Sequence, residues 1–401
     1  MRIETKNKLL FCVSHTLRYA AMLSASGVLM QTFLASLGFS ADKLYIYTSV
    51  VQAVNVTTIL LASGFANTKC LLKRDAIIQL PSAALFFSCI PFCVAAEASV
   101  TTYLLLLLIA ALHAVFSGLN TICEYKLPYM IFRPESYGAV LAVSGICGGF
   151  LSLGVGAMIS FLSSRFAYLQ IMLFALILAG VFLLLCAWLH FCMKKITGDE
   201  SEIQPAQKAP RVPLLTVFRH PAFLHLLPAN ILRGFAYGMT TVFAAIALEL
   251  EYSESVLASI ALVQSAANLI GCAVLGILSR YIHPRFSIAI GSVAYLFLPF
   301  LLVPNTRVFL LGCGIVLFGR EIVNNAVPAG LRYIVSSEIA GSYNAWRMFI
   351  HLGSGLLATT LGIILPVPVF LVLAAAAQLL SGAFYLFLPV TRKKAETKTE
   401  T

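Results

Sequence analysis

The sequence predicts an all-α membrane protein with twelve transmembrane helices arranged as two six-helix, pseudo-symmetric halves. Three observations support this prediction: an apolar composition, a regular series of long apolar segments, and a repeat of sequence features between the two halves. Of the 401 residues, 60% are hydrophobic and only 11% are charged, and the mean hydropathy is +0.92. Soluble domains of this size do not combine so little charge with so much apolar sequence, so we expect the chain to lie in a membrane.

Twelve segments are long and apolar enough to cross a bilayer, which takes about 20 helical residues. The first segment is too long for the apolar region of a signal peptide and lacks a small-residue cleavage site, so we expect it to stay as a transmembrane helix. The expected spans are 9–37, 44–66, 75–96, 101–125, 136–162, 165–193, 221–249, 254–281, 285–304, 307–334, 340–364 and 367–390.

A polar stretch separates the sixth span from the seventh. It contains Pro205, Pro210 and Pro213, and its charged residues interrupt a sequence whose other loops are short. Such a composition is typical of a linker between two structural units. The expected organisation is an N-terminal six-helix bundle (1–193), a linker (194–219) and a C-terminal six-helix bundle with a basic tail (220–401).

Lysine and arginine are unequally distributed between the two sides of the predicted membrane. By the order of the spans, 20 of the 27 lie on the side that holds both termini and the linker, three lie on the other side, and four lie inside spans. The positive-inside rule identifies the basic side as cytoplasmic. Because this asymmetry accounts for the net charge of +11, we infer no nucleic-acid partner from it.

Sequence features of the first half recur in the second. In each half an arginine is followed by a Val-Gln pair and, twelve residues after the glutamine, by a glycine. These residues are Arg18, Gln52 and Gly64 in the first half and Arg233, Gln264 and Gly276 in the second. Several matches in the same order indicate an internal duplication, with the two copies parallel because each contains six spans.

Twelve spans, a repeat of six plus six, a cytoplasmic linker and cytoplasmic termini together resemble the major facilitator superfamily. The resemblance covers essentially the whole chain. It implies two bundles that rock about a central site near the middle of the membrane, with the first, fourth, seventh and tenth helices lining the cavity. It also implies transport of a small solute rather than catalysis.

The loop motif of the family is only partly present. After the second span a glycine and basic residues match the family pattern, but Thr68 stands at the position of the aspartate. After the eighth span arginine stands at the acidic position. The gating-loop candidates are Gly64, Lys73, Arg74, Gly276 and Arg280.

Two arginines at corresponding places of the repeat are the first candidates for a solute site. Arg18 and Arg233 fall roughly 15 and 18 Å into their spans at 1.5 Å per residue, which is near the middle of the membrane. A charged group there is costly and is by default functional. The pair is similar to the arginines with which organophosphate–phosphate antiporters of the family hold an anion. The alternative is that both arginines pair with Glu321 and backbone carbonyls and only hold helices together.

The tenth span carries further polar candidates. Glu321 is the one carboxylate that falls well inside a predicted span, and it follows Arg320 directly. It is a candidate for proton coupling or for a gating ion pair. Asn324 follows one turn later on the same face and is a candidate substrate-binding residue.

The sequence therefore predicts a secondary active transporter that moves a small, anionic solute by alternating access. Two alternatives stay open: a proton-coupled exporter of lipophilic compounds, and a transport-dead membrane sensor with the same fold. No nucleotide-binding signature, catalytic constellation or metal spacing is present in the sequence, so we expect no enzyme activity, cofactor or metal. The expected partners are the solute, protons as a candidate coupling ion, and lipid. We expect a monomer in the plasma (inner) membrane with both termini cytoplasmic.

Overall fold

The computed structural model describes residues 2–25, 28–62, 71–95, 97–131, 134–163, 165–194, 217–331, 335 and 340–387. All regular structure in these residues is helical, as predicted. A membrane-embedded chain satisfies its backbone hydrogen bonds within each segment by forming helices. The helices of the first half are α1 (Arg2–Ala25), α2 (Val28–Ser36), α3 (Ala41–Leu61), α4 (Leu71–Ser88), α5 (Ile90–Ala95), α6 (Val100–Ile131), α7 (Pro134–Ser163) and α8 (Tyr168–Cys192).

The second half has the same sequence of long and broken helices. Three of its helices have a proline in the first turn, at Pro221, Pro284 and Pro368, where the missing N–H removes no helical hydrogen bond. Its helices are α10 (Pro221–Thr240), α11 (Phe243–Glu249), α12 (Glu254–Tyr281), α13 (Pro284–Val293), η1 (Ala294–Leu302), α14 (Thr306–Leu331), α15 (Ala340–Leu361) and α16 (Val367–Leu386).

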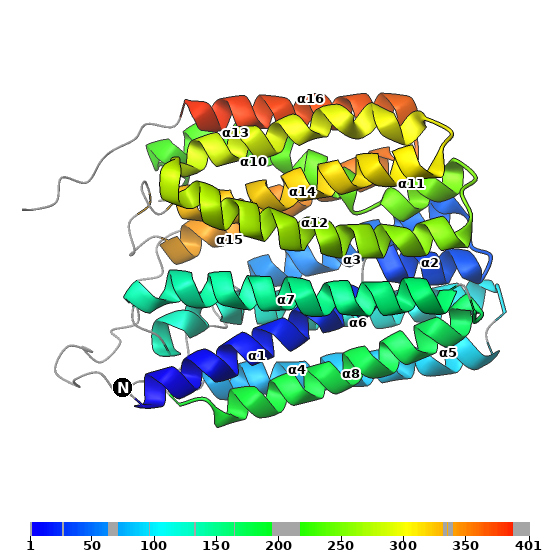
Figure 1. Cartoon of the computed structure of the whole chain (residues 1–401), viewed down its shortest axis with the longest axis horizontal. Helices are drawn as coiled ribbons and strands as arrows, with labels where there is room; N and C mark the ends of the chain where they lie inside the picture. Colours follow the sequence, from blue (N-terminus) through cyan, green and yellow to red (C-terminus); the bar gives the residue numbers. More distant parts are fainter. Residues whose placement is uncertain are drawn as a thin grey trace, which may run out of the picture.

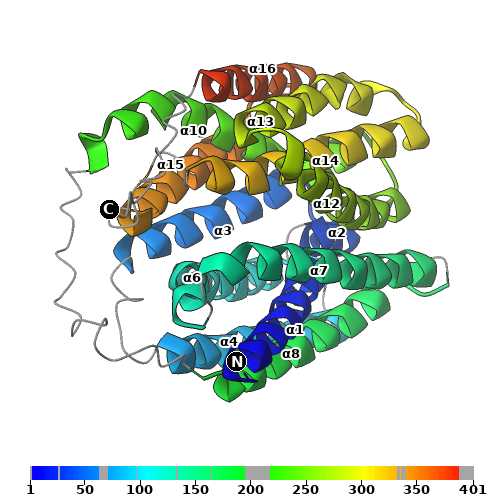
Figure 2. The same ribbon diagram turned by 60° about the vertical axis from the view of Figure 1, so that its left-hand side comes forward.

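The helices run roughly side by side, and the two halves are stacked on each other (Figure 1). We call α1–α8 the N half and α10–α16 the C half. The halves contact each other along α3 with α15 and along α7 with α12, and Figure 2 shows these two pairs at the boundary between them. We call the end where α1 begins the inner end of the bundle and the opposite end the outer end.

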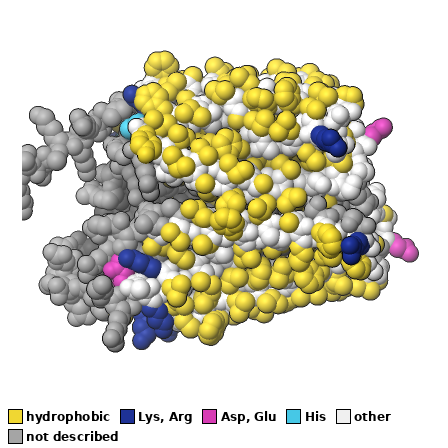
Figure 3. Space-filling view, viewed as in Figure 1, with side chains coloured by type: hydrophobic (Ala, Val, Ile, Leu, Met, Phe, Trp, Pro, Cys, Tyr) yellow, Lys and Arg dark blue, Asp and Glu magenta, His cyan; other side chains and the backbone are white. Residues whose placement is uncertain are grey.

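The sides of the bundle are apolar and its ends carry charge. On the face drawn in Figure 3, hydrophobic side chains cover the middle, and the visible Lys, Arg, Asp and Glu side chains lie towards the two ends. By length and composition, seven described helical segments can cross a membrane, or eight if the bent pair α10–α11 counts as one span. Each predicted range contains one or two described helices, although some extend beyond it: α1 begins at Arg2 instead of residue 9, and α6 ends at Ile131 instead of residue 125. The all-helical membrane fold is confirmed, and the count of twelve crossings goes beyond this composition test.

Four predicted spans contain two helical segments instead of one. The first span divides into α1 and α2, the third into α4 and α5, the seventh into α10 and α11, and the ninth into α13 and a 3₁₀ segment, η1. The bend between α10 and α11 is 53°. Hydropathy does not report such breaks because both pieces of a broken helix remain apolar.

Small residues allow the closest helix contacts. Gly234 and Gly238 of α10 form a G-x-x-x-G pair whose faces touch the backbone of α15 at His351 and Gly355. Between the halves, a Cβ atom at Gly149 of α7 would lie 3.0 Å from side-chain atoms of Leu269 on α12. In lipid, such close approach replaces the hydrophobic effect as a source of helix association.

Gly238→Ala is expected to lower the thermal stability of the purified protein, because the new methyl group would overlap the carbonyl of Gly355. Overpacking of this kind costs about 1–3 kcal/mol. Gly353→Ala on α15 is the matched control: nothing lies within 4 Å of its added Cβ, so the higher helix propensity of alanine should leave stability unchanged or raised. Equal melting temperatures for the two variants would contradict the close contact between α10 and α15.

Candidate functional site

The first helix of each half breaks at the same place in the repeat. α1 ends at Ala25 and α10 ends at Thr240, and the following helices begin at Val28 and Phe243, so both pairs are 215 residues apart. Arg18 and Arg233 have the same separation, and each lies seven residues before the end of its helix. The break therefore places both arginines equivalently, about two turns towards the inner end from a helix interruption.

Arg233 is buried inside the C half. Its side chain is on α10, only 4% of the residue surface is exposed, and its Nη2 donates a hydrogen bond of 2.8 Å to Oδ1 of Asn324 on α14. The Nε and Nη1 donors of Arg233 have no hydrogen-bond partner among the described residues. The structure thus brings together two of the three predicted substrate-binding residues and leaves donors of one of them unused.

Arg320 and Glu321 form an ion pair on α14. Nη2 and Nε of Arg320 lie 2.6 and 2.9 Å from Oε1 of Glu321. Neighbouring residues on a helix point about 100° apart, so this pair forms only because both side chains fold towards each other. Arg320 also reaches α10, where Nη1 is 3.4 Å from Oγ1 of Thr240 and the guanidinium lies 5.8 Å from the ring centre of Tyr237.

The ion pair lies where the two halves approach each other. Glu321 packs against Gly271 of α12 and is close enough to Tyr19 of α1 for an electrostatic interaction. Tyr19 in turn packs on Gly148 of α7. Glu321 is therefore placed to respond to relative movement of the halves, which a gating or proton-coupling role requires.

A narrow cavity, too small for a water-sized sphere, joins the predicted residues of the C half. Its lining contains both Arg233 and Arg320, and it contains no carboxylate. The lining residues are Arg233, Tyr237, Tyr295, Arg320, Val323, Asn324 and Gln378. All of them belong to α10, η1, α14 and α16, so the cavity lies within one half.

Arg18 occupies the equivalent place in the N half. It is partly buried on α1 and lies close enough to His113 of α6 for an electrostatic interaction. Each arginine of the repeat thus approaches the fourth span of its own half. Arg18 is not part of the cavity that contains Arg233, and the binding of one solute by both arginines stays a prediction.

The gating-loop candidates lie mostly at the edge of the described structure. Gly64 lies outside the described residues, as does the side chain of Arg280. Lys73 is exposed and Arg74 half-buried near the start of α4, and a Cβ atom added at Gly276 would meet nothing within 4 Å. The gating role of these residues stays a prediction.

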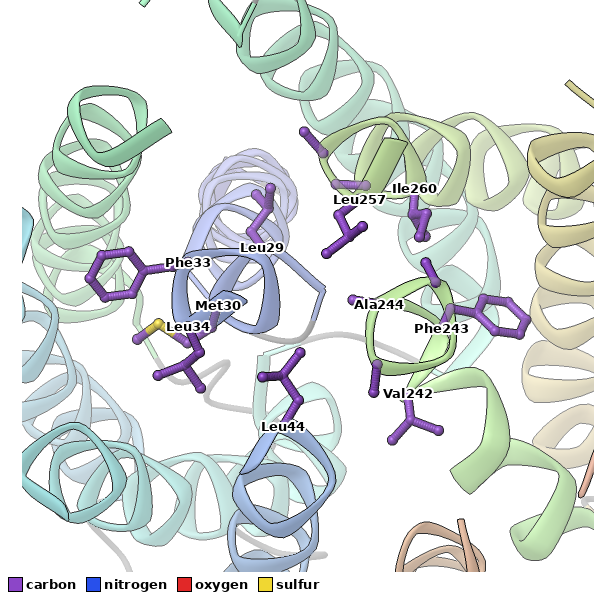
Figure 4. Close-up of a cluster of buried hydrophobic side chains, with 14 of the residues drawn as sticks. Leu29, Met30, Phe33, Leu34, Leu44, Val242, Phe243, Ala244, Leu257 and Ile260 are labelled. Atoms are coloured by element: carbon purple, nitrogen blue, oxygen red, sulfur yellow. The ribbon is translucent and has the colours of Figure 1, made fainter. Parts of the chain in front are cut away.

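An apolar cluster closes the outer end of the bundle. Figure 4 shows side chains of α2 and α3 from the N half beside side chains of α11 and α12 from the C half. The labelled members of this outer seal are Leu29, Met30, Phe33, Leu34, Leu44, Val242, Phe243, Ala244, Leu257 and Ile260.

Polar contacts cross between the halves beneath the outer seal. Gln31 donates to the carbonyl oxygen of Thr241 over 2.6 Å, and Gln52 donates to Oγ1 of Thr241 over 2.9 Å. Thr241 follows the end of α10, where the helix breaks. The helix break therefore leaves the carbonyl oxygen and the hydroxyl of Thr241 available to accept hydrogen bonds from the N half.

A buried triad in the N half was missed by the sequence analysis. Asp75 of α4 forms an ion-pair contact with Nδ1 of His190 on α8, and Nε2 of His190 lies 2.7 Å from Oγ of Ser14 on α1. Asp75 is fully buried. Asp75 is the first residue of a predicted span, where a carboxylate ordinarily contacts water. No sequence signal therefore distinguished it, and its burial is visible only in the structure.

The described residues contain no group of three or more His, Cys, Asp or Glu side chains arranged to hold a metal ion.

The chain belongs to the Major Facilitator Superfamily, whose family model matches residues 11–359. No curated protein matched the sequence. Among solved structures the chain is similar to the nucleoside transporter NupG, with 15% identity, 97% of this chain and 100% of that chain covered, and a TM-score of 0.63. It is also similar to a D-xylose-proton symporter, with 12% identity, 97% of this chain and 99% of that chain covered, and a TM-score of 0.72. A third similar structure is FucP in the outward conformation, with 13% identity, 95% of this chain and 98% of that chain covered, and a TM-score of 0.65. At these identities the likeness establishes the fold and does not identify the solute.

Asp75→Asn should destabilise the purified protein far more than Ser14→Ala. If the two groups form an ion pair, removing the acid breaks a buried salt bridge, which costs about 3–5 kcal/mol. Removing the Ser14 hydroxyl deletes one neutral hydrogen bond, worth about 1 kcal/mol. Thermal unfolding in detergent compares the two, and similar small losses in both variants would mean that the triad does not contribute as an ion pair.

Proposed function

We propose that the chain is a secondary active transporter that moves a small anionic solute across the plasma membrane by alternating access, acting as a monomer with its inner end in the cytoplasm. The coarse part of this conclusion, a multi-pass membrane protein of a transporter superfamily, follows from the family and the fold. The orientation is supported by the 20 of 27 basic residues on the side of both termini.

The observation that carries the anionic preference is an excess of buried positive charge. In the described part of the C half, Arg233, Arg320 and Arg347 are buried, and Glu321 is the one buried carboxylate. A buried cation without a counter-charge, such as Arg233, attracts an anion strongly, because little water is present to screen it.

The proposed solute site lies between α1 of the N half and α10 and α14 of the C half. The donors there are Arg18 from the N half and Arg233 with Asn324 from the C half, and the Arg320–Glu321 pair lies beside them. We infer that Glu321 exchanges its partner, or accepts a proton, when the halves separate. The outer seal in this structure corresponds to the state that loads or releases solute at the inner end.

Arg18→Gln and Arg233→Gln are each expected to lower exchange of anionic solutes at least about tenfold. A charge-assisted hydrogen bond contributes about 1.5–3 kcal/mol, which corresponds to a factor of ten or more. Counterflow into proteoliposomes, screened with a panel of small labelled carboxylates and phosphate esters, measures the effect.

Arg307→Gln is the matched control for that experiment, since Arg307 is an exposed arginine at the outer end. Anion exchange that is unchanged in the Arg18 variant would remove Arg18 from the solute site. An equal loss of exchange in the Arg307 variant would mean that the substitutions impair folding or reconstitution instead of solute binding.

A second candidate solute is a neutral, hydroxylated compound. It is favoured by Gln31 and Gln52, whose Oε1 atoms are buried and accept no hydrogen bond from any described residue. Both glutamines lie at the contact between the halves, where hydroxyl groups of a solute could donate to them. NupG and the D-xylose-proton symporter are solved neighbours whose names indicate uncharged solutes, although their likeness establishes only the fold.

If this second candidate is right, Gln52→Leu should abolish uptake of neutral pentoses or nucleosides by proteoliposomes. Gln170→Leu, an exposed glutamine on α8, should leave uptake unchanged. Absence of any such uptake by the unmodified protein, together with anion exchange, would decide for the first candidate.

A further inference from the structure

A groove between α1 and α7 lies outside the proposed solute site. It has a volume of about 590 Å³, which is within the roughly 300–1,000 Å³ of pockets that hold organic ligands. Its apolar lining includes Leu9, Val13 and Leu17 of α1 and Val140 and Val143 of α7. The groove therefore belongs to the N half alone and shares no lining residue with the solute site.

The groove opens on the side of the bundle, where the membrane lies. α1 is placed between α7 and α8 (Figure 1), with Ser14 directed at α8 and Arg18 close to α6. At 100° per residue, Leu9 and Val13 point about 140° away from the mean direction of those two residues. Leu9, Val13 and Val143 are 67%, 40% and 52% exposed. Apolar side chains exposed in this direction contact lipid.

The length of the groove matches one leaflet of a bilayer. Leu9 and Leu17 are eight residues apart, which corresponds to about 12 Å along a helix. The hydrocarbon core is about 30 Å thick, so each leaflet contributes about 15 Å. Leu9 is also the first residue of the first predicted span. The groove therefore begins at the inner membrane surface and extends through most of the acyl layer of that leaflet.

The inner end of the groove carries positive charge. Lys8 lines the groove, and Lys6 is exposed one turn before Leu9 on the same helix. Nζ of Lys8 lies 3.2 Å from a carboxylate oxygen of Glu4, but the side chain of Lys8 stays 38% exposed. An ammonium group has three N–H donors, and ion pairs at such exposed positions are weak. Lys8 can therefore bind a second anionic group, and Figure 3 shows Lys and Arg side chains at the inner end of this face.

The rest of the lining favours an acyl chain over a polar ligand. Apart from Lys8, its described polar groups are the hydroxyl of Thr16 and the thiols of Cys12 and Cys147. Thiols behave as small apolar groups with weak donors, and Sγ of Cys12 already lies 3.7 Å from the carbonyl oxygen of Val140. A polyhydroxylated solute finds too few hydrogen-bond partners here, whereas an acyl chain has no hydrogen bonds to lose.

We propose that the groove between α1 and α7 binds one phospholipid with an anionic headgroup from the leaflet at the inner end. An acyl chain lies along Leu9, Val13 and Val143, and the headgroup phosphate accepts hydrogen bonds from Lys8. Anionic lipids attract basic residues next to the membrane surface, and a lysine side chain reaches headgroup level along its methylene groups. The lipid joins α1, which carries Arg18, to α7, which packs on α12 of the C half. The proposal is independent of the identity of the solute.

The test combines native mass spectrometry and thermal unfolding of the purified, delipidated full-length protein in detergent. Dioleoyl phosphatidylglycerol, phosphatidylcholine and diacylglycerol have the same acyl chains and different headgroups. We expect one retained phosphatidylglycerol and a saturable rise in melting temperature, with half-saturation about fivefold lower than for phosphatidylcholine, the effect of one basic residue at an anionic surface. Equal half-saturation for the three lipids would overturn the role of headgroup charge. An equal rise with soluble glycerol 1-phosphate would overturn the role of the acyl chain.

Val13→Trp fills the groove and should abolish both the retained phosphatidylglycerol and the rise in melting temperature. Val181→Trp on α8 is the matched control, because Val181 is 42% exposed, close to the 40% of Val13, and does not line the groove. The control should keep both responses. A full response in Val13→Trp, or an equal loss in the two variants, would overturn the groove as the lipid site.

Lys8→Gln tests the headgroup separately from the acyl chain. We expect it to raise the half-saturation for phosphatidylglycerol about fivefold and to leave that for phosphatidylcholine unchanged. Arg219→Gln removes an exposed cation just before α10 of the C half and should change neither value. An unchanged preference for phosphatidylglycerol in Lys8→Gln would overturn the assignment of the headgroup to Lys8. This variant alters an exposed side chain, so it remains informative if Val13→Trp fails to fold.

Discussion

The cost of burying a guanidinium without a counter-charge is the constraint on which the polar interior of this protein depends. An arginine cannot discharge itself by losing a proton, so each buried one requires an acceptor, water or an anion. Arg320 meets this requirement with the neighbouring Glu321, and Arg347 meets part of it with neutral groups. Arg233 also meets part of it, with the amide oxygen of Asn324, but its Nε and Nη1 have no hydrogen-bond partner among the described residues. An electropositive centre that the protein leaves open is the simplest physical basis for recognition of an anion.

The duplication places this chemistry symmetrically, but the two halves have diverged. The break after the first helix of each half and the arginine before it keep one offset of 215 residues. The neighbours of the two arginines differ: Arg233 lies near Asn324 and Arg320, whereas Arg18 lies near His113. An ancestral two-fold arrangement has thus become one half with excess positive charge and one half with a different polar network. A solute site between unlike halves can bind an asymmetric molecule.

The proposed alternating access would act through the outer seal. The apolar side chains of the outer seal come from both halves, so they separate if the halves rock apart at that end. The hydrogen bonds from Gln31 and Gln52 to Thr241 would break in the same movement. Because Thr241 lies at the bend after α10, the same short segment contributes to closure and, through Thr240, to the surroundings of Arg320. Closure of the outer end and the environment of the ion pair are therefore coupled by adjacent residues.

The sequence by itself determined the class of protein, the positions of the apolar segments and the repeat, and it predicts the orientation. These properties depend on the lengths of the apolar segments and on the number of charged residues between them. Neither quantity changes when a helix rotates about its axis. The sequence also identified Arg233, Arg320, Glu321 and Asn324 as polar groups that need an explanation. Only the tertiary structure decided that Arg233 turns towards its own half, because the direction of a side chain follows from helix rotation and packing.

Tertiary structure alone also brought together residues that are remote in sequence. Ser14, Asp75 and His190 come from three helices of the N half, and none of them lies near the others in the chain. The breaks within four spans were equally invisible, because a bent apolar helix has the same composition as a straight one. The close packing around Arg233 depends on how four helical segments meet, and packing is a sum of many contacts that no local pattern encodes.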